Sequence, residues 1–244
     1  MEEKKTPKKV IIFGATGNAG RCLIPAALEL GHEVSAFVKN PDKLKRAFDH
    51  SLLDNVKIYQ GNALDRSAVA KALVGHEAIV NATGDHSNTD IFEKLCTTVT
   101  EEANKISAGH IRLWQYGGLP GLDIPHTDIM GSDLPGMPVI FRSHKTNYLT
   151  LKNSSLDWSF ICPGPMFFAN ITGRCNDLEI TIGKMPYKSG SWTKWLPKIT
   201  YPFIMRSHLK ELLVSYEDVA YFIMSNLDSE GEYSKKRVGI SYKY

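Results

Sequence analysis

Residues 10–20 read VIIFGATGNAG, a short apolar run followed by glycines at positions 14, 17 and 20. The first four residues are typical of a buried parallel strand, and the residues from about Arg21 to Leu30 form a helix-like segment. In a strand–turn–helix unit, the first glycine permits a tight turn and the second lets the backbone approach a pyrophosphate. The third lets the helix pack closely on the strand, and the helix N-terminus offers free N–H groups. The stretch therefore predicts a phosphate cradle for a nucleotide.

Signals for strands and helices alternate along the rest of the chain. Further strands are predicted at residues 33–38, 56–60, 78–82, 111–116, 158–162 and 237–240, and the intervening segments carry helical periodicity and caps. This alternation implies right-handed crossovers and a parallel sheet covered on both faces. We therefore expect an α/β, Rossmann-type doubly wound parallel sheet of about seven strands, in a single domain over residues 1–244. Residues 163–215 are the least regular, and we expect them to form a small irregular substrate region on the C-terminal side.

The ends of the predicted strands mark the expected ligand site. Ligands of open α/β sheets bind beyond the carboxyl ends of the strands, near the point where the strand order reverses. The segments predicted to surround this crevice are 14–20, 38–40, 61–63, 82–84, 116–118 and 163–166.

Composition narrows the class of protein. The 244 residues carry a formal net charge of only +3, and the basic residues are scattered, which argues against nucleic acid as the main partner. None of the four cysteines has C-x-x-C spacing, and no histidine–carboxylate spacing indicates a metal site. No apolar stretch resembles a signal peptide or a bilayer-spanning segment. We expect a cytoplasmic protein without a membrane partner, either a monomer or a weak homodimer.

The end of the second predicted strand bears on the choice of cofactor. An NAD site usually carries Asp or Glu about 20 residues beyond the glycines, where it holds the ribose 2′-hydroxyl. Here the sequence reads Phe37-Val38-Lys39-Asn40, without a carboxylate. Because Lys39 would attract a 2′-phosphate, we favour NADP (NADPH) over NAD. A solvated lysine at a strand end is the alternative interpretation of Lys39.

Several stretches together resemble the atypical short-chain dehydrogenase/reductase group, in particular the NmrA-like NAD(P)-binding proteins and the flavin reductase (biliverdin-IX-beta reductase-like) family. The resemblance rests on residues 10–20, 36–44 (AFVKNPDKL), 61–65 (GNALD), 78–84 (AIVNATG), 157–166 (DWSFICPGPM) and 215–222 (SYEDVAYF). These stretches span nearly the whole chain in the expected order. They are specific for the fold and the cofactor, and they do not identify a substrate.

The resemblance implies roles for individual residues. The phosphates would be wrapped by the glycine loop, with Gly14, Thr16, Gly17, Asn18, Ala19 and Gly20. Lys39 would sit by the 2′-phosphate, and Asn62 and Ala63 would edge the adenine. Thr83 and Gly84 would line the nicotinamide ribose, and Pro163 and Pro165 would belong to a wall near the nicotinamide amide.

The chain departs from the family pattern at the catalytic helix. Many relatives carry Tyr-x-x-x-Lys there, in which the tyrosine donates a proton and the lysine lowers its pKa and holds the ribose. This sequence reads Phe141-Arg142-Ser143-His144-Lys145, so the lysine is present and the tyrosine is not. We retain Lys145 and Tyr116 as catalytic candidates, with an exposed lysine and a core tyrosine as the alternatives. His126 and His144 are further possible proton donors, although isolated histidines are more often structural.

Two classes of function remain open at this point. The first is an NADPH-dependent reductase that passes hydride to a small flat, conjugated acceptor such as a flavin or quinone, for which solvent can supply the proton. The second is a non-enzymatic NADP-binding regulator, and an epimerase or dehydratase is a weaker third. Residues 185–206 contain Met185, Tyr187, Trp192, Trp195, Tyr201, Phe203 and Met205. This segment is predicted either as a lid over the substrate or as a partner surface.

Overall fold

The fold is built on a large, mostly parallel sheet. The computed structural model describes residues 6–85, 87–107, 111–169, 177–187 and 210–243. The strands are β1 (Lys9–Phe13), β2 (Glu33–Val38), β3 (Val56–Gln60), β4 (Ala78–Asn81), β5 (Arg112–Tyr116), β6 (Asp157–Pro163), β7 (Met166–Phe167), β8 (Leu178–Ile182), β9 (Val214–Ser215) and β10 (Lys236–Tyr242).

Eight of these strands form one sheet in the order β3-β2-β1-β4-β5-β6-β10-β8. The strands pair in parallel except for β8, which runs antiparallel to β10 with Val238 opposite Ile182. The order reverses beside β1, which is paired with β2 on one side and β4 on the other. This reversal is the topological switch point of a doubly wound sheet, so the predicted fold class is confirmed.

The helices are α1 (Asn18–Glu29), α2 (Pro41–Lys45), α3 (His50–Leu53), α4 (Arg66–Leu73), α5 (Thr89–Ser107), α6 (Val139–Lys152) and α8 (Tyr216–Met224). Side-chain caps explain where two of these helices begin. The Asn40 side chain accepts hydrogen bonds from the backbone N–H groups of Asp42 and Lys43, and Asp65 accepts those of Ser67 and Ala68. Each cap satisfies N–H groups that have no partner within the helix.

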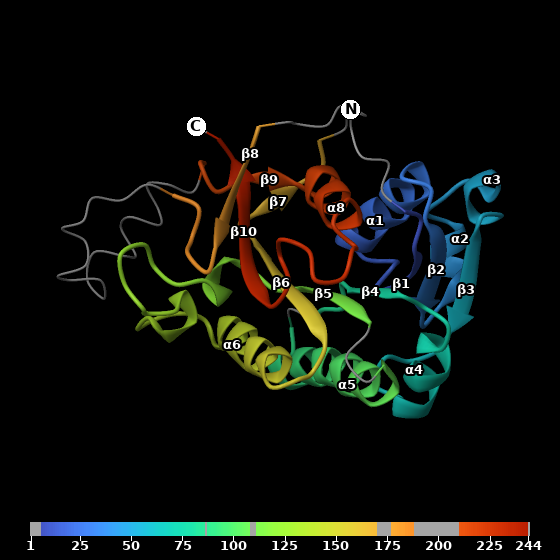
Figure 1. Ribbon diagram of the computed structural model, residues 1–244, viewed down its shortest axis with the longest axis horizontal. Helices are drawn as coiled ribbons and strands as arrows, with labels where there is room; N and C mark the ends of the chain where they lie inside the picture. Colours follow the sequence, from blue (N-terminus) through green and yellow to red (C-terminus); the bar gives the residue numbers. More distant parts are fainter. Residues whose placement is uncertain (1–5, 86, 108–110, 170–176, 188–209, 244) are drawn as a thin grey trace.

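The helices form a layer on each face of the sheet (Figure 1). α1 and α8 pack together on one face, where Val10, Ile12 and Trp114 belong to the buried cluster. α4, α5 and α6 cover the other face, where Ile11 and Phe13 are buried. Successive side chains of a strand point to opposite faces, so the continuous apolar run of β1 serves both layers.

The C-terminal region contains more regular structure than the sequence predicts. β8 adds an eighth strand at the sheet edge, and β7 pairs with β9 in a separate two-stranded sheet. All three strands lie in the part of the chain expected to be irregular, and β7 and β9, with two residues each, are too short to leave a periodic signal. Residues 170–176 and 188–209 lie outside the described residues, and so do Trp192, Trp195, Tyr201, Phe203 and Met205 of the expected lid or partner surface. Met185 and Tyr187 are described, and both are buried.

Candidate functional site

The glycine loop connects β1 to α1 with the geometry that a phosphate cradle needs. Gly14 has φ of 76°, and a Cβ there would lie 2.5 Å from the backbone oxygen of Ala82. The Gly17 N–H donates to the Gly14 oxygen over 2.9 Å. A Cβ on Gly20 would overlap the Gly14 oxygen and the Ala15 backbone. Gly14 and Gly20 therefore each meet a steric requirement that only glycine satisfies without displacement.

The start of α1 is open to a ligand. Gly17 occupies the N-cap position and lacks a side chain to cap the helix, so no side-chain cap forms there in the described structure. Gly17 and Asn18 are exposed, while Thr16 and Ala19 are half-buried. The Asn18 side chain accepts a hydrogen bond from Arg21 over 2.9 Å. The unsatisfied N–H groups of the first turn and the helix dipole make this end suitable for an anion.

A lysine-rich hollow lies beside the glycine loop. It measures about 840 Å³ and is lined by Thr16, Lys39, Asn40, Pro41, Asp42, Lys43, Lys45 and Gln60. Lys45 lies 3.9 Å from Asp42, whereas Lys39 has no carboxylate at ion-pair distance among the described residues. The fold therefore brings Thr16 of the glycine loop and Lys39, the residue after β2, to the same cavity. This arrangement is electrostatically suited to a phosphate on an adenosine ribose.

The ends of β3 and β4 form the next part of the crevice. Asn62 follows β3, and its side-chain oxygen accepts the Leu64 N–H over 3.1 Å. Ala63 is buried, and after β4 Thr83 is half-buried while Gly84 is exposed. The carboxyl ends of β1 and β4 are in register, with Phe13 opposite Asn81, so these residues share one edge of the sheet with the glycine loop.

A buried polar network positions Thr83. The Asn81 side-chain oxygen accepts hydrogen bonds from the Thr83 hydroxyl over 2.7 Å and from the Thr83 N–H over 3.2 Å. The Asn81 amide nitrogen donates to the Gln115 side-chain oxygen over 2.8 Å, and Gln115 donates to the Cys96 sulfur over 3.2 Å. Because its hydrogen is used by Asn81, the Thr83 hydroxyl is left with its acceptor lone pairs. The sequence does not signal this network, since its members come from separate elements.

Tyr116 lies at the end of β5 but faces the buried interior. It belongs to the apolar cluster under α1 and α8, and its hydroxyl has no hydrogen-bond partner in the described structure. Burial, with smaller contributions from Cys22 and Tyr216, raises the pKa of this phenol. Its role as a proton donor stays a prediction.

Lys145 forms an ion pair with the Asp133 carboxylate. Its Nζ lies 2.8 Å from both carboxylate oxygens of Asp133, which belongs to the 3₁₀ helix η2 (Gly131–Asp133). Both side chains are partly exposed. The ribose contact predicted for Lys145 would require this lysine to share or leave Asp133.

His144 approaches the crevice more closely than its position in the sequence suggests. A Cβ on Gly118, just beyond β5, would lie 2.9 Å from His144 Nε2. The ring stacks on Phe141 at a centroid distance of 6.2 Å and meets the edge of Phe92 at 5.6 Å. The His144 side chain thus extends from α6 toward the end of β5. His126, the other histidine considered, has φ of 62°.

The wall predicted at Pro163 and Pro165 contacts the segment that precedes α8. Pro163 is the last residue of β6 and is buried, whereas Pro165 is exposed. The Val214 N–H donates to the Pro165 oxygen over 3.3 Å, and a Cβ on Gly164 would overlap the Leu212 backbone. The close contact at Gly164 therefore depends on the absence of a side chain.

Neither a metal cluster nor a membrane span is found among the described residues. No group of at least three His, Cys, Asp or Glu side chains there could hold a metal ion. The helices of the same part of the chain include none long and apolar enough to cross a bilayer.

Comparison with known proteins gives a match over most of the chain. A family model described as NAD(P)H-binding matches residues 14–184. The chain is 31% identical over 109 residues to the probable pinoresinol-lariciresinol reductase 3 of Arabidopsis thaliana, covering 43% of this chain and 34% of that protein. It is 27% identical over 126 residues to the isoflavone reductase homolog IRL of Zea mays, covering 50% and 38%. The aligned region thus spans little more than a third of either relative.

Solved structures share the fold over nearly the whole chain. A protein of Bacteroides thetaiotaomicron proposed to be an epimerase has a TM-score of 0.73 at 22% identity, covering 98% of this chain and 99% of that one. A protein of Streptococcus pneumoniae proposed to be an NADH-flavin reductase has a TM-score of 0.69 at 20% identity, covering 97% and 100%. A wide-type short-chain dehydrogenase/reductase of Veillonella parvula, solved with NADP, has a TM-score of 0.67 at 14% identity, covering 97% and 95%.

Proposed function

Because the chain belongs to the NAD(P)H-binding family, we propose that it is an NADPH-dependent oxidoreductase that transfers hydride to a flat, conjugated acceptor. A flavin or a quinone has the required chemistry, and the similar Streptococcus pneumoniae structure supports the flavin through its proposed NADH-flavin reductase activity. We propose a single cofactor-binding domain over residues 1–244, in which residues 163–215 contribute to the substrate side.

The observation that carries the choice of NADPH is the lysine-rich hollow. Lys39, Lys43 and Lys45 line it together with Thr16 of the glycine loop. A 2′-phosphate placed here would gain charge-assisted hydrogen bonds, whereas the NAD ribose would find no carboxylate at the end of β2. The residues present therefore fit NADPH better than NADH.

The remaining cofactor contacts follow the edge of the sheet. We propose that the glycine loop, Gly14 to Gly20, holds the pyrophosphate through its N–H groups, and that Asn62 and Ala63 edge the adenine. Thr83 and Gly84 would line the nicotinamide ribose, with Thr83 accepting a hydrogen bond because Asn81 uses its proton. Pro163 and Pro165 would flank the nicotinamide amide. Lys145 would reach the ribose from its position on Asp133.

Reduction of a flavin or quinone requires little acid–base catalysis by protein side chains. When bound, the reduced nicotinamide supplies the hydride. The position of the usual catalytic tyrosine is Phe141, which cannot donate a proton. A flavin or quinone can accept its proton from solvent, so the loss of that tyrosine is compatible with reduction of such an acceptor. A ketone substrate would depend on an acid at that place.

The decisive experiment measures steady-state NADPH oxidation over a panel of flavins and quinones. Turnover with at least one acceptor is expected, and Lys39→Glu should reduce it by raising the KM for NADPH. Tight NADPH binding without turnover on any acceptor would instead support a regulatory NADP-binding protein. That second function is favoured by Phe141 and by the burial of the Tyr116 hydroxyl, which together remove the usual proton donors.

A further inference from the structure

Arg21 is the first charged residue of α1, and its side chain lies beside the open end of that helix. Its Nη2 donates to the Asn18 side-chain oxygen over 2.9 Å. Asn18 is the first residue of α1 and follows Gly17, the exposed N-cap residue. Because the side chains of a helix are directed toward its N-terminus, the guanidinium lies next to the first turn, whose backbone N–H groups have no partner within the helix.

The Arg21 guanidinium has several donors left for a ligand. An arginine carries five N–H donors, and among the described residues only the Asn18 oxygen accepts a hydrogen bond from Arg21. No described carboxylate lies within ion-pair distance of it. Its charge is therefore available to an anion that binds at the start of α1.

An aromatic ring from the segment after β6 packs on this guanidinium. Arg21 Cζ lies 5.6 Å from the centroid of the Phe168 ring, which is within the range of a cation–π contact. Phe168 itself packs on Tyr216 at a centroid distance of 4.8 Å. The next residue, Ala169, donates its N–H to Glu217 of α8 over 3.1 Å. The start of α8 thus fixes the position at which Phe168 meets Arg21.

We propose that Arg21 pairs with the pyrophosphate of the bound dinucleotide, and that Phe168 is a positioning residue that holds the guanidinium beside the glycine loop. An arginine can present two parallel N–H groups to a phosphate, so its contact is more directional than that of a lysine. The inference rests on the proposed role of the glycine loop as the phosphate cradle. It connects the segment after β6 to the cofactor, because Phe168 contacts the residue that holds the pyrophosphate.

Arg21 and Lys39 would contact different groups of the cofactor. Lys39 lines the hollow proposed for the 2′-phosphate, which NADPH carries and NADH lacks. The pyrophosphate is common to both dinucleotides. Loss of the Arg21 guanidinium should therefore weaken NADPH and NADH by the same factor, whereas Lys39→Glu should discriminate between them.

The test is a calorimetric titration of Arg21→Met with two fragments of the cofactor. ADP-ribose carries the pyrophosphate without the 2′-phosphate, and adenosine 2′-monophosphate carries the 2′-phosphate without the pyrophosphate. The affinity for ADP-ribose should fall by about tenfold or more, because a charge-assisted hydrogen-bonded pair is lost. The affinity for adenosine 2′-monophosphate should not change. Since Arg21 is exposed and methionine is a good helix former, the variant should remain folded.

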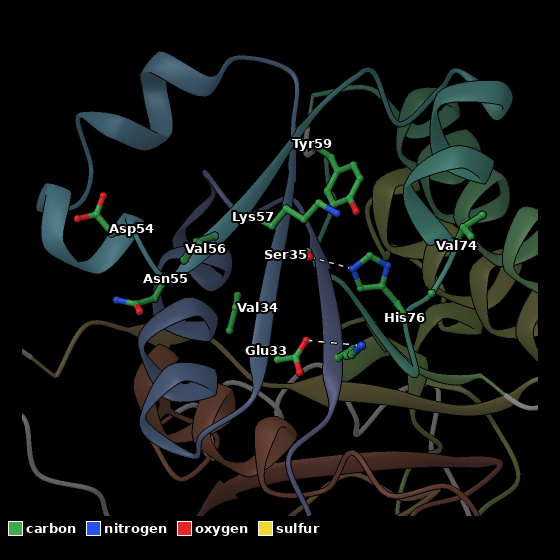
Figure 2. Close-up of a pocket in the computed structure, with 12 residues that line it drawn as sticks. Glu33, Val34, Ser35, Asp54, Asn55, Val56, Lys57, Tyr59, Val74 and His76 are labelled. Carbon is green, nitrogen blue, oxygen red and sulfur yellow. Dashed lines mark hydrogen bonds and ion pairs between the residues drawn. The ribbon is translucent and has the colours of Figure 1, made fainter.

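Lys57→Met is the matched control. Lys57 is likewise an exposed cation packed on an aromatic ring, with its Nζ 4.9 Å from the centroid of Tyr59. It lines a hollow near the start of β3, at the end of the sheet opposite the glycine loop (Figure 2). This variant loses the same charge away from the cofactor, so it should bind both fragments as the unaltered protein does.

A double-variant cycle tests the role of Phe168. Phe168→Leu removes the ring that packs on Arg21, and it should lower the affinity for ADP-ribose by about two- to fivefold. In the Arg21→Met background the same change should have no further effect, because the guanidinium that Phe168 positions is absent. Phe168→Tyr keeps an aromatic ring and should retain the affinity of the unaltered protein. Additive losses in the double variant would overturn the positioning role.

The outcomes separate this inference from the proposed function. Binding of ADP-ribose by the unaltered protein, with the same affinity in Arg21→Met, would overturn the inference alone. An equal loss of affinity for adenosine 2′-monophosphate in Arg21→Met would also overturn it, because the substitution would then have disturbed the whole site. Failure of the unaltered protein to bind either NADPH or ADP-ribose would contradict both.

Discussion

A Cβ added to Gly14 would lie 2.5 Å from the backbone oxygen of Ala82, so the turn after β1 and the end of β4 are in direct contact. The contact joins the glycine loop, the proposed phosphate cradle, to the residue that precedes Thr83. The atoms that a Cβ at position 14 would meet are backbone atoms, so side-chain movement alone cannot relieve the overlap. The same closeness holds two parts of the candidate cofactor site at a fixed separation.

The Gly14→Ala variant should lose stability and cofactor affinity together. Gly31 has nearly the same backbone conformation, with φ of 79° against 76°, but a Cβ there meets nothing within 4 Å. Gly31→Ala therefore reports the cost of the left-handed backbone alone, about 1–2 kcal/mol. Gly14→Ala should cost clearly more in urea unfolding, because it adds the overlap with Ala82. Equal losses in the two variants would show that the loop can move away from β4.

Changing Lys39 to Glu should separate the two dinucleotides. The substitution places a carboxylate where the 2′-phosphate is proposed to bind, so NADPH affinity should fall by about tenfold or more. NADH affinity should change little or improve. Lys152→Glu, on the end of α6, makes the same charge change away from the hollow and should spare both cofactors. Calorimetric titration with each dinucleotide provides the measurement, and a parallel loss of both affinities in Lys39→Glu would contradict the assignment.

Asn81 and Gln115 should behave as a coupled pair. Asn81→Leu leaves the Gln115 side-chain oxygen without its donor and the Thr83 hydroxyl without its acceptor. Unsatisfied buried groups cost about 1–3 kcal/mol each, so a loss in that range is expected in chemical unfolding. The Asn81→Leu, Gln115→Leu double variant should lose less than the sum of the single variants. Additive losses would mean that the two amides act independently.

Two ion pairs on different parts of the fold should differ sharply in their contribution to stability. Arg112 lies 3.2 Å from Asp157, and both side chains are buried, whereas Lys145 and Asp133 are 43% and 42% exposed. Burial lowers the pKa of Arg112 to about 10, with Asp157 opposing this effect. Asp157→Ala should cost about 3–5 kcal/mol, because it strands a buried charge. Asp133→Ala should cost less than about 1 kcal/mol.

The Asp133→Ala variant also tests the position of Lys145. With the carboxylate removed, Lys145 is free to reach the ribose, so cofactor affinity should be kept or increased. A marked loss of affinity would mean that Asp133 orients Lys145 toward the cofactor.

His76 should make stability depend on pH. Burial lowers the pKa of the His76 imidazole; backbone hydrogen bonds to Leu73 and Ala72 oppose this effect, and the charges of Lys57 and Lys9 add to it. The unfolded chain, with an ordinary histidine pKa of about 6.5, then binds a proton that the folded protein does not. The free energy of unfolding should therefore rise with pH from below the folded pKa up to about 6.5, and this contribution is complete above that value.

The His76→Gln variant measures this dependence directly. It should flatten the rise of unfolding free energy between acidic and neutral pH, as followed by urea titrations at several pH values. His50→Gln, changed at an exposed residue of α3, serves as the control for losing a histidine. An unchanged slope in His76→Gln would show that other groups produce the pH dependence.

Local patterns in the sequence were sufficient to predict the central parallel sheet and the first strand–turn–helix unit. The apolar run and glycine spacing at residues 10–20 predict β1, the turn and α1, although α1 begins at Asn18, before the predicted start at Arg21. The Asp65 cap and the break at Gly75 likewise bound α4. These features depend on neighbours within a few residues, which is why they can be predicted. β7 and β9 are paired only through tertiary contact, and neither has enough length for a pattern.

The partners of the site residues were decided by the tertiary structure. The sequence favours Lys39 as the contact of a 2′-phosphate, and it leaves Lys145 and Tyr116 as catalytic candidates with an exposed lysine and a core tyrosine as the alternatives. The fold places Lys39 in a hollow with Thr16, pairs Lys145 with Asp133, and buries the Tyr116 hydroxyl in the core. The physical reason is that the crossovers bring together residues far apart in the chain, and the pleat decides which face each side chain takes. The sequence thus determined the strand–glycine loop–helix unit in which a nucleotide cradle is predicted, and the tertiary structure decided which charges surround it.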